Sequence, residues 1–436
     1  MRTSGQWAVG SRPCAAHCPL PTVHWARLAV VYHRPFYQDE AGRLWEAEGA
    51  FSRYVEALAD KVDEVVICAP CRPEPFASGA YRLRADNVVL CPLPFFDNLA
   101  RFYVGLPFML ARLWRELPNW DVVNFRLPTP LGVYAYVLAR LRRRPVFLLV
   151  VGDLAGVAKS VPLNSPKRVV YRVYLAIEER LQDWMVSGTP TFVNGRALYE
   201  KYSRAGRRVM QTTTSTISAA DVACRTDVSA GASPGAPIRL LCVSRIDPRK
   251  GLRYLPQAIA DLVARGHDVR LTIVGPVVGS LGMEERARVT RDAAALGVAE
   301  RVDFAGPKTL PEVLQLGREH DLFVLPTLPG EGVPRVLLEA MAVGLPIVAS
   351  SVAGIPSLIA HEVNGLLVPP ANSAALAEAI DRLVGDHELR QQLIANGYTV
   401  ARAQTTEAHI HGIVDGLERL AGIRLQRAGA AATAAR

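Results

Sequence analysis

The sequence predicts an α/β protein of two Rossmann-like domains whose parallel sheets face a central cleft. The chain has 436 residues, enough for about two or three domains. Short runs rich in Val and Leu alternate with amphipathic stretches along the chain, the pattern of parallel sheets covered by helices on both faces. This alternation stops near residue 220 and restarts near residue 238, so we expect a boundary between two such domains there.

The first domain is expected over residues 27–220. Residues 1–26 precede it and lack the apolar core of a signal peptide, so we expect a loose extension there. The expected strands are 27–32, 64–68, 87–91, 121–125 and 146–151, and the expected helices are 50–61, 101–116, 131–143 and 169–185.

The second domain is expected over residues 238–425, after a linker at 221–237 that is rich in Gly, Pro, Ser and Ala. An Ala-rich tail at 426–436 is expected to be frayed. The expected strands are 238–243, 269–274, 301–304, 322–325 and 346–349, and the expected helices are 253–264, 284–296 and 334–342. A cleft between two such domains is a usual place for a ligand.

The net charge of +9 is carried entirely by the first half of the chain. Residues 1–220 hold 28 Lys and Arg against 18 Asp and Glu, whereas residues 221–436 hold 22 against 23. The basic half therefore suggests an acidic membrane surface or a phosphate-bearing acceptor, or simply a solvated surface. No nucleic-acid-binding signature accompanies the charge, so nucleic acid is disfavoured. The segment 101–120 mixes aromatic and basic residues, and either contact with a membrane or packing inside the domain would explain it.

The cysteines and the hydropathy indicate a cytoplasmic protein. Seven cysteines form an odd, sparse set, as expected in a reducing compartment. Cys68 and Cys71 have the spacing of a redox or metal pair, but no second pair accompanies them, so buried or loop thiols are favoured. No apolar run approaches the ~18 residues of a membrane-spanning helix.

The loop after the expected strand 238–243 carries the first candidate site. In an open parallel sheet, the loop at the carboxyl end of a strand lines the ligand crevice. Arg245 and Lys250 lie on this loop and would suit a phosphate or diphosphate, and Gly251 lets the chain turn into a helix. An ordinary basic surface loop is the alternative.

The segment after the expected strand 322–325 carries the second site. Pro334 suits the first position of a helix, and Gly332 leaves the backbone bare for the approach of an anion to the helix start. Glu331 precedes this helix and Glu339 lies within it, among apolar residues, where a carboxylate needs a polar partner. The vicinal hydroxyls of a ribose would be such a partner.

Residues 238–400 resemble the retaining nucleotide-sugar glycosyltransferases of glycosyltransferase family 4, which have the GT-B fold. The resemblance is carried in order by SRIDPRKGL, LTIVGP, RVDFAGP, the Glu331–Glu339 spacing, GLPIVASSVAGIPSLI and NGLLVPP. It implies that Arg245 and Lys250 hold the donor diphosphate and that Glu331 contacts the donor sugar. It also implies that Glu339 binds the ribose and that Gly332 and Val333 lie against the sugar and phosphate.

The N-terminal half resembles the family more loosely. Gly49 is the candidate for the glycine-led loop that follows the first strand, although the preceding segment 34–48 is longer and more charged than usual. Many members carry a His where this chain has Gly152 and Asp153. Asp153 could orient sugar hydroxyls or could cap a helix. His33, at another strand end, could face the acceptor or simply pack.

The expected function is transfer of a sugar from a nucleotide-diphosphate-sugar to a glycan or lipid-linked acceptor, in polysaccharide or glycoconjugate synthesis. The resemblance implies retention of anomeric configuration. No Asp-x-Asp or His/carboxylate cluster marks a metal site, so catalysis without metal or other cofactor is expected. The alternatives are a nucleotide-sugar epimerase of the same fold and a non-catalytic nucleotide-sugar-binding scaffold. A NAD-linked oxidoreductase is disfavoured because the three-glycine spacing is missing.

Overall fold

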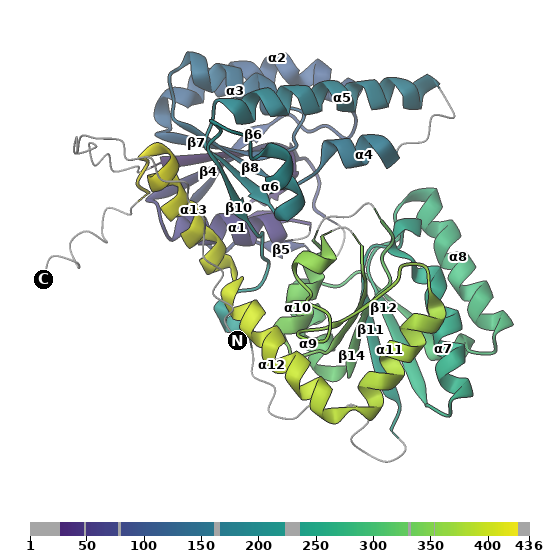
Figure 1. Ribbon diagram of the computed structural model, residues 1–436. Coiled ribbons are helices and arrows are strands. Elements are labelled where there is room, and N and C mark those ends of the chain that lie inside the picture. The colour runs from purple at the N-terminus through teal and green to yellow at the C-terminus, as the bar shows by residue number, and fades with distance from the viewer. Residues whose placement is uncertain are drawn as a thin grey trace, which may run out of the picture.

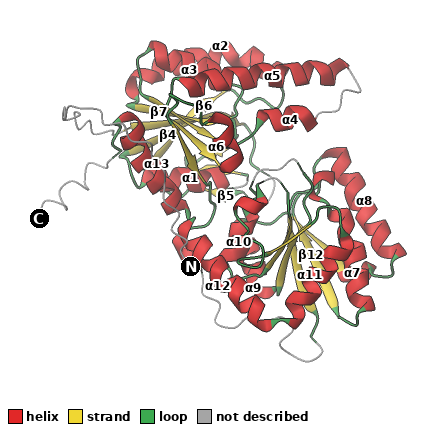
Figure 2. Ribbon diagram, in the orientation of Figure 1, coloured by secondary structure: helices red, strands yellow, loops and turns green. Residues whose placement is uncertain are grey.

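The computed structural model describes residues 27–47, 49–76, 80–160, 166–222, 236–329, 333–352 and 354–425. These residues form two α/β domains, one above the other in Figure 1. Each domain has a largely parallel sheet with helices on both faces (Figure 2), as the sequence predicts. The predicted extension 1–26, residues 223–235 of the predicted linker and the predicted tail 426–436 lie outside the described residues.

The parallel strands of the N-terminal domain run in the order β10-β9-β8-β7-β1-β4, with β6 also paired to β4. The strand order reverses at β1, which lies between β4 and β7. The five strands that the sequence predicts are confirmed, whereas β9 and β10 were not predicted. Their bounds are β1 Arg27–Val31, β4 Glu64–Arg72, β6 Val88–Leu93, β7 Val122–Leu127, β8 Val146–Val150, β9 Thr191–Asn194 and β10 Val209–Thr212.

The charged segment 34–48 contains a β-hairpin, which the sequence did not indicate. Strands β2 (Phe36–Gln38) and β3 (Leu44–Glu46) pair antiparallel, and β5 (Tyr81–Arg82) pairs with β3. Asp39 closes the turn, since its Oδ1 accepts hydrogen bonds from the backbone N–H groups of Ala41 and Arg43. Asp39, Glu40 and Arg43 therefore lie at the turn, while Phe36 and Leu44 are buried.

Helices cover both faces of the N-terminal sheet. One core lies under α2 and α3, where Phe102, Met109 and Leu113 of α2 are buried, and the other lies under α1. Asn98 caps α2 by accepting a hydrogen bond from Arg101 N. The bounds are α1 Ala50–Ala59, α2 Leu99–Glu116, α3 Gly132–Leu141, α4 Leu154–Ser160, α5 Pro166–Ser187 and α6 Arg196–Tyr202.

The C-terminal domain has six parallel strands in the order β13-β12-β11-β14-β15-β16. The order reverses between β11 and β14, which makes the carboxyl ends of these two neighbours the natural ligand crevice. The strands are β11 Ile238–Val243, β12 Val269–Val274, β13 Val302–Gly306, β14 Leu322–Leu325, β15 Ile347–Ser350 and β16 Leu366–Val368. The helices are α7 Leu255–Ala264, α8 Gly279–Ala295, α9 Leu310–Glu319, α10 Val336–Ala342, α11 Ser373–Gly385 and α12 His387–Ala403.

The last helix, α13 (Thr406–Ala421), returns to the N-terminal domain (Figure 1). Ile410, Ile413 and Leu417 are fully buried in the core that also holds α1. The domain boundary predicted at residue 425 is therefore corrected to the turn between α12 and α13. The physical reason is that α13 shields apolar N-terminal core that would otherwise face water.

The two cysteines of the Cys-x-x-Cys motif lie in one strand, β4. Residues three apart in a strand point to opposite faces of the sheet, so Cys68 and Cys71 do not face each other. Cys68 instead lies beside Cys91 across the β4–β6 pair, and both are buried free thiols. Within the described ranges, no helix has both the length and the apolar character needed to cross a membrane.

Candidate functional site

The loops after β11 and β14 touch each other at the carboxyl edge of the C-terminal sheet. The backbone N–H of Leu328 donates a 2.8 Å hydrogen bond to the carbonyl of Arg249. Gly251 has a φ of 65°, and a Cβ at this position would lie 2.0 Å from the carbonyl oxygen of Pro326. Only glycine permits this close approach, so Gly251 allows the two loops to pack against each other at this point.

The loop after β11 presents two predicted cations in different environments. Arg245 is exposed, whereas Lys250 is only 7% exposed. Burial, together with the positive charges of Arg245 and Arg249, lowers the pKa of Lys250 to about 8. Arg249 is engaged by Asp247, with 2.7 Å between its Nη2 and Oδ2 of the carboxylate. The loop therefore concentrates positive charge where the strand order reverses.

Helix α10 begins at Val336, two residues later than the predicted start at Pro334. Its Glu339 is partly buried, and burial raises the pKa of this carboxyl. The hydroxyl of Thr216 donates a 2.6 Å hydrogen bond to Oε1 of Glu339. The polar partner that the sequence required for Glu339 is therefore supplied, in this structure, by a residue that follows β10 of the N-terminal domain.

Two of the predicted donor-binding residues, Glu331 and Gly332, lie outside the described residues. Val333, the next residue, is described and lines a cavity between the two domains. The predicted roles of Glu331 and Gly332 thus stay predictions.

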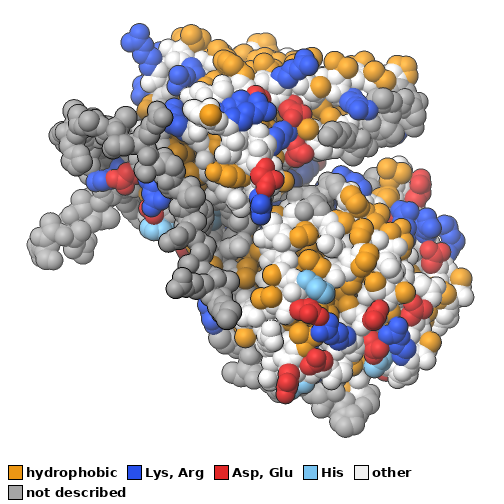
Figure 3. Space-filling model, viewed as in Figure 1, with side chains coloured by type: hydrophobic (Ala, Val, Ile, Leu, Met, Phe, Trp, Pro, Cys, Tyr) orange, Lys and Arg blue, Asp and Glu red, His pale blue; other side chains and the backbone are white. Residues whose placement is uncertain are grey.

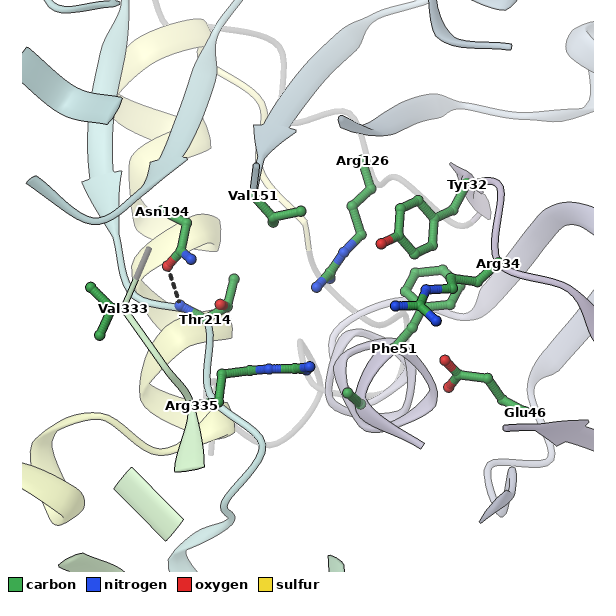
Figure 4. A pocket seen from close by; sticks show the side chains of 11 residues that line it. Tyr32, Arg34, Glu46, Phe51, Arg126, Val151, Asn194, Thr214, Val333 and Arg335 are labelled. Carbon is green, nitrogen blue, oxygen red and sulfur yellow. Dashed lines mark hydrogen bonds between the residues drawn. The ribbon is translucent and has the colours of Figure 1, made fainter. Parts of the chain in front are cut away.

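The cavity has a volume of about 230 Å³ and lies at the carboxyl ends of the N-terminal strands (Figure 4). Its polar walls include Asn194, whose Oδ1 accepts a 3.0 Å hydrogen bond from Thr214 N. Two of its lining residues, Val333 and Arg335, come from the C-terminal domain, so the cavity exists only where the domains meet. The full lining is Tyr32, Arg34, Glu46, Ala50, Phe51, Arg126, Val151, Asn194, Thr214, Val333 and Arg335.

Arg126 is the most distinctive lining residue that sequence reasoning missed. It lies in β7 and is only 6% exposed, with its guanidinium over the rings of Tyr54, Tyr32 and Phe51 at 4.8, 5.3 and 5.5 Å from their centroids. The available signal was a charged residue inside the apolar run 122–127, close to the strand's carboxyl end. The sequence prediction ended that strand at residue 125 and so passed over it.

Neither His33 nor Gly49 lines the cavity, although their neighbours in the chain do, and their acceptor-side roles stay predictions. His33 follows β1, and burial together with the charges of Arg34 and Arg126 lowers its pKa to about 4. The imidazole is therefore neutral near pH 7. Gly49 has a φ of 71° and precedes α1, whose first two residues line the cavity.

Asp153 is a helix cap in this structure, which is the alternative that the sequence left open. Its Oδ2 accepts a 2.9 Å hydrogen bond from Gly156 N at the start of α4, and its Oδ1 accepts one of 2.7 Å from Lys201 Nζ. Both oxygens accept a hydrogen bond and Asp153 does not line the cavity, and the contact with sugar hydroxyls stays a prediction. Its neighbour Gly152 packs closely, since a Cβ there would lie 2.9 Å from Cδ of Pro128.

The described part of the chain contains no group of three or more His, Cys, Asp and Glu side chains that could hold a metal ion. The prediction of metal-independent chemistry is not tested by this observation.

Comparison with known proteins matches residues 226–400 to the family described as glycosyl transferases group 1. The amylovoran biosynthesis glycosyltransferase AmsK of Erwinia amylovora is 38% identical over 152 residues, 34% of this chain and 36% of that protein. The putative colanic acid biosynthesis glycosyltransferase WcaL of Salmonella typhimurium is 33% identical over 168 residues, 37% and 40% of the two chains. The matched segments thus span only about two fifths of these relatives.

Similarity of the fold extends over nearly the whole chain. HepE of Anabaena, solved in complex with UDP, aligns with a TM-score of 0.64 at 19% identity, over 91% of this chain and all of that one. WaaG, a glycosyltransferase involved in lipopolysaccharide biosynthesis, aligns with a TM-score of 0.61 at 17% identity over the same shares. These likenesses confirm the predicted GT-B fold of two Rossmann-like domains.

Proposed function

We propose that the protein is a glycosyltransferase that moves a sugar from a nucleotide-diphosphate-sugar donor to a glycan or lipid-linked acceptor. The observation that carries this proposal is the placement of Arg245 and Lys250 at the reversal of strand order in the C-terminal sheet. The match of residues 226–400 to group 1 glycosyltransferases supports it. The structures of HepE with UDP and with UDP-glucose support a nucleotide-sugar donor.

In the proposed reaction, the bond between the anomeric carbon and the donor diphosphate breaks while an acceptor hydroxyl oxygen bonds to that carbon. Negative charge grows on the departing diphosphate, which also takes up the acceptor's proton. Arg245 and Lys250 would stabilise that charge, and they do so best where water is excluded. Lys250 is already desolvated, so little reorganisation is needed when the leaving group forms. Attack from the face of the leaving group would retain anomeric configuration.

The carboxylates have separate proposed roles. Glu331 would hold hydroxyls of the donor sugar, and Glu339 would accept hydrogen bonds from the ribose. Because Thr216 already donates to one oxygen of Glu339, the ribose would use its other oxygen or displace the Thr216 hydroxyl. Gly332 and the backbone of Val333 would approach the sugar and phosphate. No metal or other cofactor is part of the proposal, and full activity in excess EDTA is expected.

Two substitutions test the proposal directly. Arg245→Ala and Glu331→Ala are each expected to reduce transfer by about 100-fold or more, because each removes a contact made to the reacting donor. A panel of UDP- and GDP-linked sugars is assayed by thermal shift and by donor turnover. Activity near the wild-type level in both variants would overturn the assignment. Arg265→Ala, on an exposed arginine paired with Asp381, is the control for loss of charge alone.

An epimerase of the same fold is distinguished by turnover of donor without an acceptor. A binding scaffold is distinguished by donor binding without any turnover. The transferase is expected to need both substrates for rapid turnover, with at most slow donor hydrolysis in the absence of acceptor.

We also propose peripheral contact with the inner face of an anionic membrane, in the cytoplasm. Hydrophobic side chains gather along the top of the N-terminal domain in Figure 3, over α2, α3 and α5. Val104 and Phe108 of α2 are 76% and 70% exposed, and Val170 of α5 is 69% exposed. Exposed arginines, among them Arg101 and Arg140, lie on the same helices. Apolar and basic side chains together favour an anionic lipid surface.

The membrane proposal is tested by co-sedimentation with vesicles. Phe108→Asp is expected to abolish preference for vesicles that contain anionic lipid over neutral ones, because it places a charge in the apolar contact. Leu281→Asp, at a residue of the C-terminal domain that is 59% exposed, is the matched control. Equal binding of the wild type to neutral and anionic vesicles would contradict the proposal.

A further inference from the structure

The cavity between the domains contains a cation whose hydrogen-bonding groups are unsatisfied. Nε and Nη1 of Arg126 are buried and have no hydrogen-bond partner among the described residues. The neighbouring aromatic rings stabilise its charge through their faces but cannot accept its in-plane N–H groups. A buried guanidinium whose N–H groups lack acceptors destabilises the folded protein unless a bound group accepts those hydrogen bonds.

Further positive groups face the same space. Arg34 follows β1 and Arg335 precedes α10, and Figure 4 shows the guanidinium ends of Arg126 and Arg335 pointing toward the middle of the cavity. Among the described residues that line the cavity, Glu46 is the one carboxylate, against three guanidinium groups. Its Oε2 already accepts hydrogen bonds from Ser52 N and Oγ at 2.8 and 2.9 Å. The described lining therefore carries more positive than negative side chains.

The lowered pKa of His33, which follows β1, is consistent with positive charge near the cavity. Burial is the main cause of its lowered pKa, and the charges of Arg34 and Arg126 add to it. A neutral imidazole adds no charge of its own to the cavity, so it does not offset the positive charge of Arg126.

We infer that the cavity binds an anionic group, a phosphate monoester or a carboxylate, carried by the acceptor, with Arg126 as its principal ligand. The guanidinium would give its free N–H groups to two oxygens of the anion, and Arg335 would approach from the other domain. This inference rests on the proposed function and narrows its acceptor class. The cavity is lined mainly by the N-terminal domain, whereas the donor cations Arg245 and Lys250 do not line it.

The position of Arg335 links binding of the acceptor's anion to the contact between the two domains. Arg335 lies in the segment that leads from the donor-side loop into α10, and it reaches a cavity whose other charged residues belong to the N-terminal domain. An anion held by both Arg126 and Arg335 would stabilise the arrangement in which donor and acceptor sites face each other.

The test compares binding of probes that differ only in their anionic group. Glucose 6-phosphate, glucuronic acid and glucose, with inorganic phosphate as a fourth probe, are titrated into the full chain by calorimetry. At least one anionic sugar is expected to bind 10-fold or more tightly than glucose. Arg126→Met is expected to weaken that binding by about 10- to 100-fold, the range for a charge-assisted contact, and Arg126→Lys by less.

Two controls separate this site from a structural role and from the donor site. Because Arg126 is unsatisfied, Arg126→Met without ligand is expected to unfold at the wild-type temperature or above, whereas a structural arginine would lower it. UDP and GDP are expected to bind the variant within about twofold of wild type. Arg335→Gln provides a second variant, with weaker anion binding expected, and Arg265→Met is the charge control.

Three results would overturn the inference. These are no preference of the wild type for any anionic probe, unchanged anion binding in Arg126→Met, or an equal loss of nucleotide diphosphate binding in that variant, which would assign Arg126 to the donor. Since the readout is binding rather than transfer, these outcomes differ from failure of the proposed function, which Arg245→Ala and Glu331→Ala test separately.

Discussion

The two domains place cations at the carboxyl ends of their sheets in different ways. In the C-terminal domain, Arg245 and Lys250 lie on one short loop, within the seven residues that directly follow β11. In the N-terminal domain, Arg34, Arg126 and the incoming Arg335 are far apart in the chain and meet only in the folded protein. The first arrangement suits a diphosphate, which all nucleotide-diphosphate-sugar donors share. The second suits an acceptor that differs between enzymes, because residues on separate elements can be substituted independently.

The difference extends to desolvation. Lys250 and Arg126 are 7% and 6% exposed. Burial lowers the pKa of Lys250, so this lysine can lose its proton, whereas an arginine stays protonated at any ordinary pH. The charge of Lys250, the cation proposed for the donor, is therefore sensitive to pH, and that of Arg126 is not.

The largest expected effect is on the donor loop. Lys250→Met is expected to lower kcat/KM about 100- to 1000-fold, because it removes a desolvated charge from the leaving group. Steady-state kinetics with the best donor measures this. Lys250→Arg, which keeps the charge, is the control. A kcat/KM of Lys250→Met within tenfold of the wild-type value would contradict the proposed role of Lys250.

The loop contact is the next largest effect. Gly251→Ala is expected to destabilise the protein by about 2–4 kcal/mol, since it combines a positive φ with a clash against the carbonyl of Pro326. Gly266→Ala, at a positive φ with open space around it, should cost about 1 kcal/mol. Urea unfolding measures the stability of both variants. Equal losses of stability would show that the close contact between Gly251 and the loop after β14 is unimportant.

The pH dependence should separate the two sites. Lys250 is protonated below its pKa of about 8 and neutral above it, so donor affinity should be constant at lower pH and fall as pH rises through 8. Above the pKa of Lys250, donor affinity can fall by at most about tenfold for each unit of pH. Lys250→Arg should remove this fall, and glucose 6-phosphate binding at Arg126 should show none over pH 7.5–9.5. A parallel fall at both sites would contradict the assignment.

The smallest expected effect concerns the contact between Glu339 and Thr216. Thr216→Val removes one hydrogen bond to a partly buried carboxylate and is expected to cost about 1–2 kcal/mol of stability. Donor affinity should change by less than about fivefold, because the ribose can take the vacated oxygen. Thermal unfolding and titration with UDP and GDP measure both quantities. A loss of donor affinity as large as that of Lys250→Met would place Thr216 in the donor site.

The alternation of strands and helices was predictable because it depends on local patterns. Strands β11, β12 and β14 have the predicted bounds, since each is a short, mainly apolar run whose apolar residues are mostly buried. The hairpin β2–β3 was missed because its strands have three residues each and its turn residues are charged. Helix α13 looks like any amphipathic helix, and only packing shows which domain it covers.

The candidate site divides in the same way. Arg245, Lys250 and Glu339 could be found from the sequence because each belongs to a short ordered motif beside a predicted strand. For Asp153 the sequence left two roles open, because a carboxylate at a strand end can equally cap a helix, and the cap depends on Gly156 and Lys201, which periodicity does not place. Arg126 was passed over because the predicted strand ended at residue 125, and its aromatic neighbours and missing hydrogen-bond partners are visible only in the packed structure.

By itself, the sequence determined the two α/β domains, the place of the boundary near residue 220 and the cations after β11, since local periodicity and contiguous motifs encode them. Only the tertiary structure decided that α13 returns to the first domain, that Thr216 holds Glu339 and that Arg126 faces a shared cavity. The physical reason is that burial and missing hydrogen-bond partners are properties of packed surroundings, and residues distant in the chain supply those surroundings.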